Sequence, residues 1–180
     1  MKILVTGSKG QLGNELQLLA AKRPDPEFIF TDYQELDITS IDAVNRFVKE
    51  ARPEWIINCA AYTSVDKAEA EPEAAHLLNA DAPGYLAAAA ASCGARMIHI
   101  STDYVFSGRN YRPYRESDPA APKGVYAESK ARGEINVMEA APDSIIVRTS
   151  WLYSAYGHNF VKTILRAGKE KGLLKVVADQ

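Results

Sequence analysis

The 180-residue sequence is poor in cysteine and carries no large surplus of either charge. Only Cys59 and Cys93 occur, which excludes a disulfide-stabilised scaffold and a four-cysteine metal site. Lys and Arg number 21 against 23 Asp and Glu, a net charge of −2 that argues against a nucleic-acid or polybasic membrane surface. No apolar run approaches the roughly 18 residues of a membrane span, and the first residues show no signal-peptide pattern. We therefore expect a cytoplasmic protein without a nucleic-acid or membrane partner.

The sequence does contain a regular alternation of short apolar runs with longer segments of helical spacing. The runs predict strands at 2–6, 28–31, 55–59, 96–101, 144–148 and 174–177. Helices are predicted at 10–22, 41–51, 72–92, 125–141 and 160–169. Thr39 or Ser40 can cap the second helix, and Pro83-Gly84 suggests a kink in the third. Strands that are apolar on both faces and separated by helices indicate an α/β fold with a doubly wound parallel sheet and helices on both faces.

Three glycines stand between the first predicted strand and the first predicted helix. Gly7 can make the tight turn, Gly10 lets the backbone approach a pyrophosphate, and Gly13 lets the helix pack closely on the sheet. Gln11 and Leu12 open the helix, whose N-terminus offers free N–H groups to a phosphate. This placement predicts a Rossmann-type dinucleotide-binding fold.

Asp32 ends the second predicted strand, where a carboxylate accepts hydrogen bonds from an adenosine ribose. It favours NAD(H), because a 2′-phosphate would meet a like charge, although Lys9 or Arg23 could still admit the phosphate. Further candidate cofactor-binding residues follow the second and third strands: Asp37, Ile38, Ala60, Ala61 and Tyr62.

Tyr126 and Lys130 share one face of a predicted helix, with Cβ atoms about 5–6 Å apart. An ammonium there is expected to lower the tyrosine pKa, so that the phenol exchanges a proton with a carbonyl oxygen near neutral pH. Thr102, at the end of the fourth strand, could hydrogen-bond the same oxygen. These three residues are the candidate catalytic set. The proline-rich loop 107–124 follows the same strand and is either functional or a flexible surface loop.

Taken together, these motifs resemble those of the extended short-chain dehydrogenase/reductases over essentially the whole chain. Within that superfamily the sequence is similar to the dTDP-4-dehydrorhamnose reductase family. The similarity rests on TGSKGQLG at 6–13, NCAAYT at 58–63, VDKAE at 65–69, NADAP at 79–83, STDYVFSG at 101–108, Tyr126–Lys130 and RTSWLY at 148–153. The STDYVF block discriminates best, because epimerases and dehydratases tend to be serine-rich there.

The resemblance implies reduction, with NADH or NADPH, of the 4-keto group of dTDP-6-deoxy-L-lyxo-4-hexulose to dTDP-L-rhamnose. Tyr126 would protonate the new alkoxide, Lys130 would hold the nicotinamide ribose, and Thr102 would orient the sugar oxygen. The resemblance also implies a sugar pocket lined by Asp103, Tyr104, Val105 and Trp151. An Mg²⁺-bridged homodimer is a further implication, with Glu15 as a possible ligand.

The sequence departs from the family in two respects. Ala127 stands where the family often has glycine, a small change on a helix. Family members are also longer, and their C-terminal part builds the nucleotide-sugar site. We therefore expect a dinucleotide-binding domain at 1–150, the start of a substrate domain at 151–180 that is cut inside a motif at Asp179-Gln180, and no turnover by these residues alone.

Two other functions remain open from the sequence. One is a different nucleotide-sugar enzyme of the superfamily, such as a 4-epimerase or dehydratase. The other is a non-catalytic NADP-binding subunit, resembling the regulatory subunit of methionine adenosyltransferase. The intact Thr102, Tyr126 and Lys130 favour an enzyme.

Overall fold

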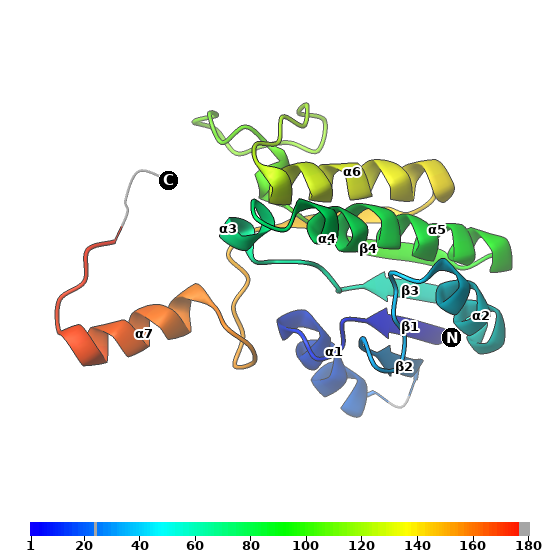
Figure 1. Cartoon of the computed structure of the whole chain (residues 1–180). Helices are drawn as coiled ribbons and strands as arrows, with labels where there is room; N and C mark the ends of the chain where they lie inside the picture. The colour runs from blue at the N-terminus through cyan, green and yellow to red at the C-terminus, as the bar shows by residue number, and fades with distance from the viewer. Residues whose placement is uncertain (24, 177–180) are drawn as a thin grey trace.

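The computed structural model describes residues 1–23 and 25–176, and it contains one parallel sheet with helices on both sides (Figure 1). The strands are β1 (Lys2–Thr6), β2 (Glu27–Thr31), β3 (Trp55–Asn58), β4 (Arg96–Thr102) and β5 (Ile145–Thr149). The longer helices are α1 (Gln11–Ala21), α2 (Ile41–Ala51), α5 (Ala82–Cys93), α6 (Val125–Ala140) and α7 (Phe160–Lys171). Short helical segments are α3 (Val65–Ala68), α4 (Pro72–His76), the π-helical turn η1 (Leu77–Asp81) and the 3₁₀ segment η2 (Asp103–Val105).

The sheet has the strand order β2-β1-β3-β4-β5, with every pair parallel. The chain starts on β1, moves outward to the edge strand β2 and then returns to β3 on the other side of β1. This reversal places a topological switch point between β1 and β3, where ligands of open α/β sheets bind outside the carboxyl ends of the strands. The register aligns those ends, because Thr6 lies opposite both Thr31 and Asn58. The predicted doubly wound parallel sheet is confirmed.

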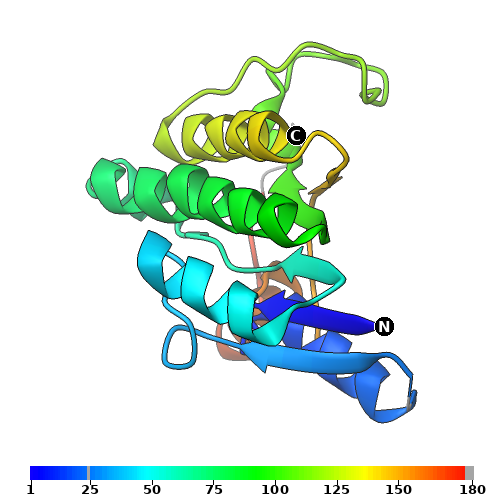
Figure 2. The same cartoon turned by 90° about the vertical axis from the view of Figure 1, so that its right-hand side faces the viewer.

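Helices α2, α5 and α6 lie side by side on one face of the sheet, and α1 lies on the other (Figure 2). The main core is formed between the first face and its helices, around Leu4, Ile56, Met97 and Leu86, none of which is exposed. The opposite face is less covered at β5, where Ile145 and Val147 remain 42% and 37% exposed.

Local signals explain where the helices begin and end. The side chain of Ser40, rather than that of Thr39, caps α2 by accepting a hydrogen bond from Ala43 N. Gly94 ends α5 in the left-handed conformation, with φ +74°. The segment predicted as one helix over 72–92 is three consecutive helical segments, and its irregularity is the π-helical turn η1 rather than a kink at Pro83-Gly84. Pro83 instead occupies the first turn of α5, where its missing N–H costs nothing.

The strand predicted at 174–177 is wrong over residues 174–176, which form neither helix nor strand; Val177 and the Asp179-Gln180 motif lie outside the described residues. A strand needs a neighbour to pair with, and Leu173 and Val176 are 80% and 52% exposed. The loop 107–124 is anchored at its base, where Tyr114 stacks on Phe106 with ring centroids 4.2 Å apart. Within the described residues, no helix is long and apolar enough to cross a membrane.

Candidate active site

The glycine loop brings the end of β1 into close contact with the end of β3. Gly7 has φ +68°, and a Cβ atom there would lie 2.6 Å from Ala60 N, so only glycine fits. A side chain at Gly13 would collide with the carbonyl oxygen of Gly7. Gly13 therefore lets α1 pack on the loop itself, which differs in detail from the predicted packing on the sheet. Gly10 is extended at the start of α1 and caps the helix with no side chain. The first-turn N–H groups of a helix have no partner within the helix and are suited to bind an anion.

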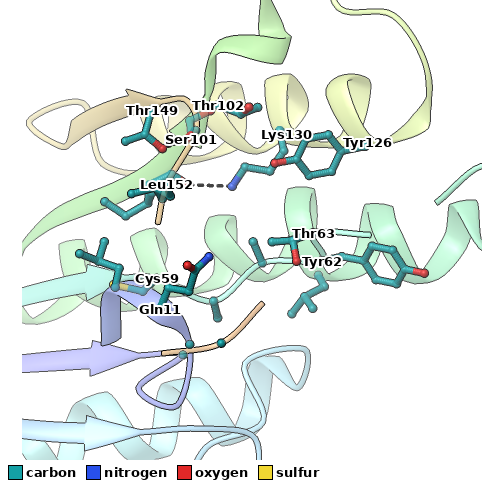
Figure 3. A pocket seen from close by; sticks show the side chains of 18 of the residues that line it. Gln11, Cys59, Tyr62, Thr63, Ser101, Thr102, Tyr126, Lys130, Thr149 and Leu152 are labelled. Atoms are coloured by element: carbon teal, nitrogen blue, oxygen red, sulfur yellow. Dashed lines mark hydrogen bonds between the residues drawn. The ribbon is translucent and has the colours of Figure 1, made fainter. Parts of the chain in front are cut away.

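A cavity of about 930 Å³ lies at the carboxyl ends of the strands, next to this loop. It brings together most of the residues predicted from the sequence: Gly7, Gly10, Gln11, Leu12, Asp32, Asp37, Ile38, Ala60, Ala61, Tyr62, Thr102, Asp103, Tyr104, Tyr126, Lys130 and Trp151. Figure 3 shows Lys130 and Tyr126 projecting from α6 on one side, with Gln11 and Cys59 across from them. Such a cavity, opened by a glycine loop and a helix N-terminus, fits a dinucleotide.

Three predicted site residues do not line this cavity. Val105 is a correction to the expected sugar pocket, because its side chain is fully buried and packs with Phe106 and Ala131 beneath the surface. Gly13 acts through packing, as described above. Glu15 is exposed on α1, and the described residues contain no group of three His, Cys, Asp or Glu side chains that could hold a metal ion.

Asp32 lies at the end of β2 with its carboxylate fixed by backbone N–H groups. Oδ2 accepts from Lys9 N and Oδ1 accepts from Tyr33 N, each at 2.9 Å. The Lys9 ammonium lies 3.8 Å from a carboxylate oxygen of Glu35. The two backbone N–H donors fix the orientation of the Asp32 carboxylate where it lines the cavity.

Tyr126 and Lys130 occupy the first two turns of α6, as predicted. The Lys130 side chain is only 2% exposed, and its Nζ donates to the carbonyl oxygen of Ile100 at 2.7 Å. The Tyr126 ring meets the edge of Tyr104, with centroids 5.7 Å apart. The Thr102 hydroxyl lies at the end of β4, where it accepts from Tyr104 N and donates to Asp103 Oδ1.

The predicted lowering of the Tyr126 pKa is wrong for this structure. Burial raises the pKa of the phenol above its usual value, and its hydrogen bond with Thr102 only partly opposes this effect. Burial also lowers the pKa of Lys130 to about 8, while the Glu134 carboxylate opposes that shift. Sequence spacing showed that the two groups share a helix face, whereas the dominant cause of both shifts is desolvation in the folded protein.

Several cavity residues were missed in the sequence: Cys59, Thr63, Ser101, Thr149, Ser150, Leu152, Gly157 and His158. Cys59, Ser101, Thr149 and Ser150 end or follow strands, so the rule that parallel strands present ligand sites at their carboxyl ends could have found them. Burial raises the pKa of the Cys59 thiol to about 12, which leaves it protonated and unreactive.

Two amide side chains hold the walls of the cavity in place. Asn79, on the π-helical turn, is fully buried; its Oδ1 accepts from Tyr62 N at 2.8 Å and its Nδ2 donates to Tyr62 O at 3.0 Å. Asn79 Nδ2 also donates to Ser129 Oγ on α6. On the opposite side, Asn159 Nδ2 donates to Gln11 Oε1 at 3.0 Å, which ties the start of α7 to the glycine loop.

Comparison with known proteins places this site in a defined family. The family model described as "RmlD substrate binding domain" matches residues 1–180. Curated relatives include the dTDP-4-dehydrorhamnose reductases of Aggregatibacter actinomycetemcomitans, 46% identical over 99% of this chain and 61% of the relative, and of Sinorhizobium fredii, 46% identical over 100% of this chain and 60% of the relative. The chain thus spans about 60% of the length of these curated relatives.

Solved structures agree with these matches. A dTDP-4-dehydrorhamnose reductase from Clostridium acetobutylicum superposes with a TM-score of 0.97 at 49% identity, over 100% of this chain and 64% of that one. The reductase from Bacillus anthracis, solved in complex with NADP, gives a TM-score of 0.90 at 45% identity, over 94% of this chain and 60% of that one. Because the family model matches residues 1–180 and the glycine loop and cavity agree with it, the chain belongs to the RmlD substrate binding domain family.

Proposed function

We propose that this chain carries the cofactor-binding and proton-transfer part of an NAD(P)H-dependent reductase. Its substrate is the 4-keto group of dTDP-6-deoxy-L-lyxo-4-hexulose, and its product is dTDP-L-rhamnose. The observation that carries the proposal is the convergence of Thr102, Tyr126 and Lys130 on the cavity beside the glycine loop. The names of the relatives, which are 43–49% identical, support the choice of substrate.

Residues 1–150 form the dinucleotide-binding domain in this proposal, and residues 151–180 begin the substrate domain. The first turn of α1 and Gly10 receive the pyrophosphate, since the N–H groups and the helix dipole both favour negative charge. Asp32, Asp37 and Ile38 surround the adenosine end. Ala60, Ala61 and Tyr62 support the cofactor at the end of β3, where Asn79 fixes the Tyr62 backbone.

The catalytic residues have separate tasks. The reduced nicotinamide, when bound, supplies the hydride. Tyr126 donates its proton to the sugar O4, and its raised pKa suits this role because the phenol stays protonated at neutral pH. Lys130, with a pKa of about 8, is mostly an ammonium at neutral pH and holds the ribose. Thr102 orients the sugar oxygen from the end of β4.

The sugar side of the cavity is formed by Asp103, Tyr104 and Trp151. Tyr104 and Trp151 are 51% and 63% exposed, so this side of the cavity is open to water in the described chain. Positioning of the substrate accounts for about 7–11 kcal/mol of a reaction barrier in favourable cases. We therefore expect the 180 residues by themselves to bind a dinucleotide weakly and to reduce the keto-sugar very slowly or not at all.

Cofactor choice and assembly complete the proposal. NADH is accepted at least as well as NADPH, because a 2′-phosphate would meet the like charge of Asp32. The Lys9 ammonium, which lies 3.8 Å from a carboxylate oxygen of Glu35, still admits the phosphate. On the family resemblance, Glu15 contributes to an Mg²⁺-bridged homodimer in the cytoplasm. Sedimentation with Mg²⁺ and with EDTA tests the assembly, and a metal-independent monomer would contradict it.

The activity is tested by mixing the natural full-length protein with NADH and the keto-sugar and following absorbance at the nicotinamide band. The proposal expects stoichiometric net oxidation of NADH. A 4-epimerase would convert the sugar without net oxidation, and a regulatory subunit would bind the dinucleotide without turnover. Either result would contradict the proposed reductase function.

A further inference from the structure

A buried set of polar contacts lies behind the candidate catalytic residues. Its centre is Glu134 on α6, which is 7% exposed. Ser101 Oγ, at the end of β4, donates to Glu134 Oε1 at 2.5 Å. Arg148 on β5 donates from Nε to Oε1 at 2.9 Å and from Nη2 to Oε2 at 2.6 Å. One carboxylate thus joins two strands and the catalytic helix.

Each member of this set is next to a residue of the candidate active site. Ser101 lies between Thr102 and Ile100, the residue whose carbonyl oxygen accepts the hydrogen bond from Lys130. Glu134 follows Lys130 by one helical turn and therefore lies on the same face of α6. The Arg148 guanidinium also lies over the Phe106 ring, 4.8 Å from its centre, and so contacts the segment that follows β4.

The chemistry of the contacts favours a positioning role over a general stabilising one. A buried ion pair contributes little net stability relative to apolar packing, because desolvation of two charges offsets their attraction. A bidentate arginine–carboxylate pair does, however, impose a definite geometry on the groups it joins. Here the joined groups are the two strand ends and the helix that must hold Thr102, Tyr126 and Lys130 within bonding distance of one substrate oxygen.

We propose that Glu134 is a positioning residue of the active site, which uses Ser101 and Arg148 to hold the end of β4 at a fixed distance from the helix that carries Tyr126 and Lys130. The inference rests on the proposed reductase function. Glu134 does not line the cavity, so it acts through Ser101 and Lys130 rather than on the substrate.

The kinetic test compares Glu134→Ala, Glu134→Gln and the control Glu139→Gln in the natural full-length protein. Glu139 is exposed on the same helix. We expect Glu134→Ala to lower kcat by about 10²-fold, with kcat calculated from the concentration of protein that binds dinucleotide. This is the effect that a displacement of catalytic groups by about 1 Å can have. The dinucleotide Kd should change less. Glu134→Gln is expected to recover part of the loss, because its amide oxygen still accepts from Ser101. A wild-type kcat in folded Glu134→Ala would overturn the proposal.

A second measurement does not depend on turnover. The titration of Lys130 can be followed by NMR on protein that contains ¹³C-labelled lysine. The ionisable groups near its ammonium are Glu134 and Tyr126 (Figure 3), both on α6, and His99 on β4. We expect Glu134→Gln to lower the Lys130 pKa and Glu139→Gln to leave it unchanged. An unchanged pKa in Glu134→Gln would overturn the proposal. Absence of keto-sugar reduction by the wild type, with the pKa shift present, would instead count against the reductase function alone.

Discussion

The Lys130 ammonium donates a hydrogen bond to the carbonyl oxygen of Ile100 at 2.7 Å. This contact anchors a buried cation from α6 to the end of β4, the strand that also carries Thr102. The ammonium has further hydrogen-bonding capacity, since a lysine has three donors, and the cavity lies beside it. The strand therefore fixes the position of the ammonium at the wall of the cavity.

Replacing Lys130 with methionine is expected to weaken dinucleotide binding and to slow turnover together. A hydrogen bond to a charged group contributes about 1.5–3 kcal/mol. In the proposed function the Lys130 ammonium donates such a bond to the nicotinamide ribose, so its loss would affect both binding and turnover. Calorimetric titration with NADH and a turnover assay measure the two effects. Lys123→Met, in the exposed loop before α6, is the matched control. Unchanged NADH affinity in Lys130→Met would remove the lysine from the cofactor site.

Replacing Tyr126 with phenylalanine is expected to lower kcat by roughly 10²–10⁴-fold, the usual contribution of a general acid. Dinucleotide affinity should change little, since the ring and its edge contact with Tyr104 are kept. Steady-state kinetics and NADH titration on the same preparation separate the two. Tyr111→Phe, on a side chain that is 88% exposed, serves as control. Near wild-type turnover in Tyr126→Phe would mean that another group donates the proton.

Replacing Asp32 with asparagine is expected to shift cofactor preference from NADH toward NADPH. The substitution removes the negative charge that a 2′-phosphate would meet, while the side-chain oxygen can still accept from Lys9 N. Titration of each cofactor gives the ratio of the two Kd values, with Asp42→Asn on the exposed side of α2 for comparison. A wild-type protein that clearly prefers NADPH would show that the Lys9 cation outweighs the Asp32 carboxylate.

His99 is expected to make the protein less stable in acid. Its ring is fully buried on β4, Asn58 Nδ2 lies 3.1 Å from its Nδ1, and burial lowers its pKa to about 3. Between the unfolded value of about 6.5 and that folded value, only the unfolded chain binds the proton, so stability falls as pH falls. The slope from this one group is at most about 1.4 kcal/mol per pH unit.

Urea unfolding between pH 7 and pH 4 measures this slope. The variant His99→Gln, which cannot take up the proton, is expected to show a shallower decline than the wild type. His76→Gln, on α4, should follow the wild type. Equal slopes for wild type and His99→Gln would contradict a neutral, buried imidazole.

The sequence was sufficient to predict most of the fold, because its signals are local. Apolar runs and helical spacing placed β1, β4 and α2 within a residue of their observed bounds. The glycine loop could be interpreted because a side chain at Gly7 or Gly13 would collide with neighbouring backbone, a requirement that the sequence pattern itself indicates. The predicted strand at 174–177 failed over residues 174–176 because a strand depends on a partner, which no local pattern reveals.

Most of the candidate residues could be placed at one cavity from the sequence, but their pKa values and supporting contacts could not be predicted. Residues that follow strands, such as Asp32 and Thr102, could be placed together from the topology alone. The raised pKa of Tyr126 could not be foreseen, because burial depends on the whole folded environment. The contacts of Asn79 with Tyr62 and of Glu134 with Arg148 also escaped prediction, since nothing in their spacing distinguishes them from solvent-facing residues.

The most direct measurement of the central claim follows the hydride itself. The natural full-length protein is supplied with the keto-sugar and NADH that carries two deuterium atoms at C4 of the nicotinamide, and the product is analysed by NMR and mass spectrometry. We expect dTDP-L-rhamnose with one deuterium on C4 of the sugar, formed at a much lower rate by Tyr126→Phe. A product without deuterium, or NADH that remains unconsumed, would contradict this claim.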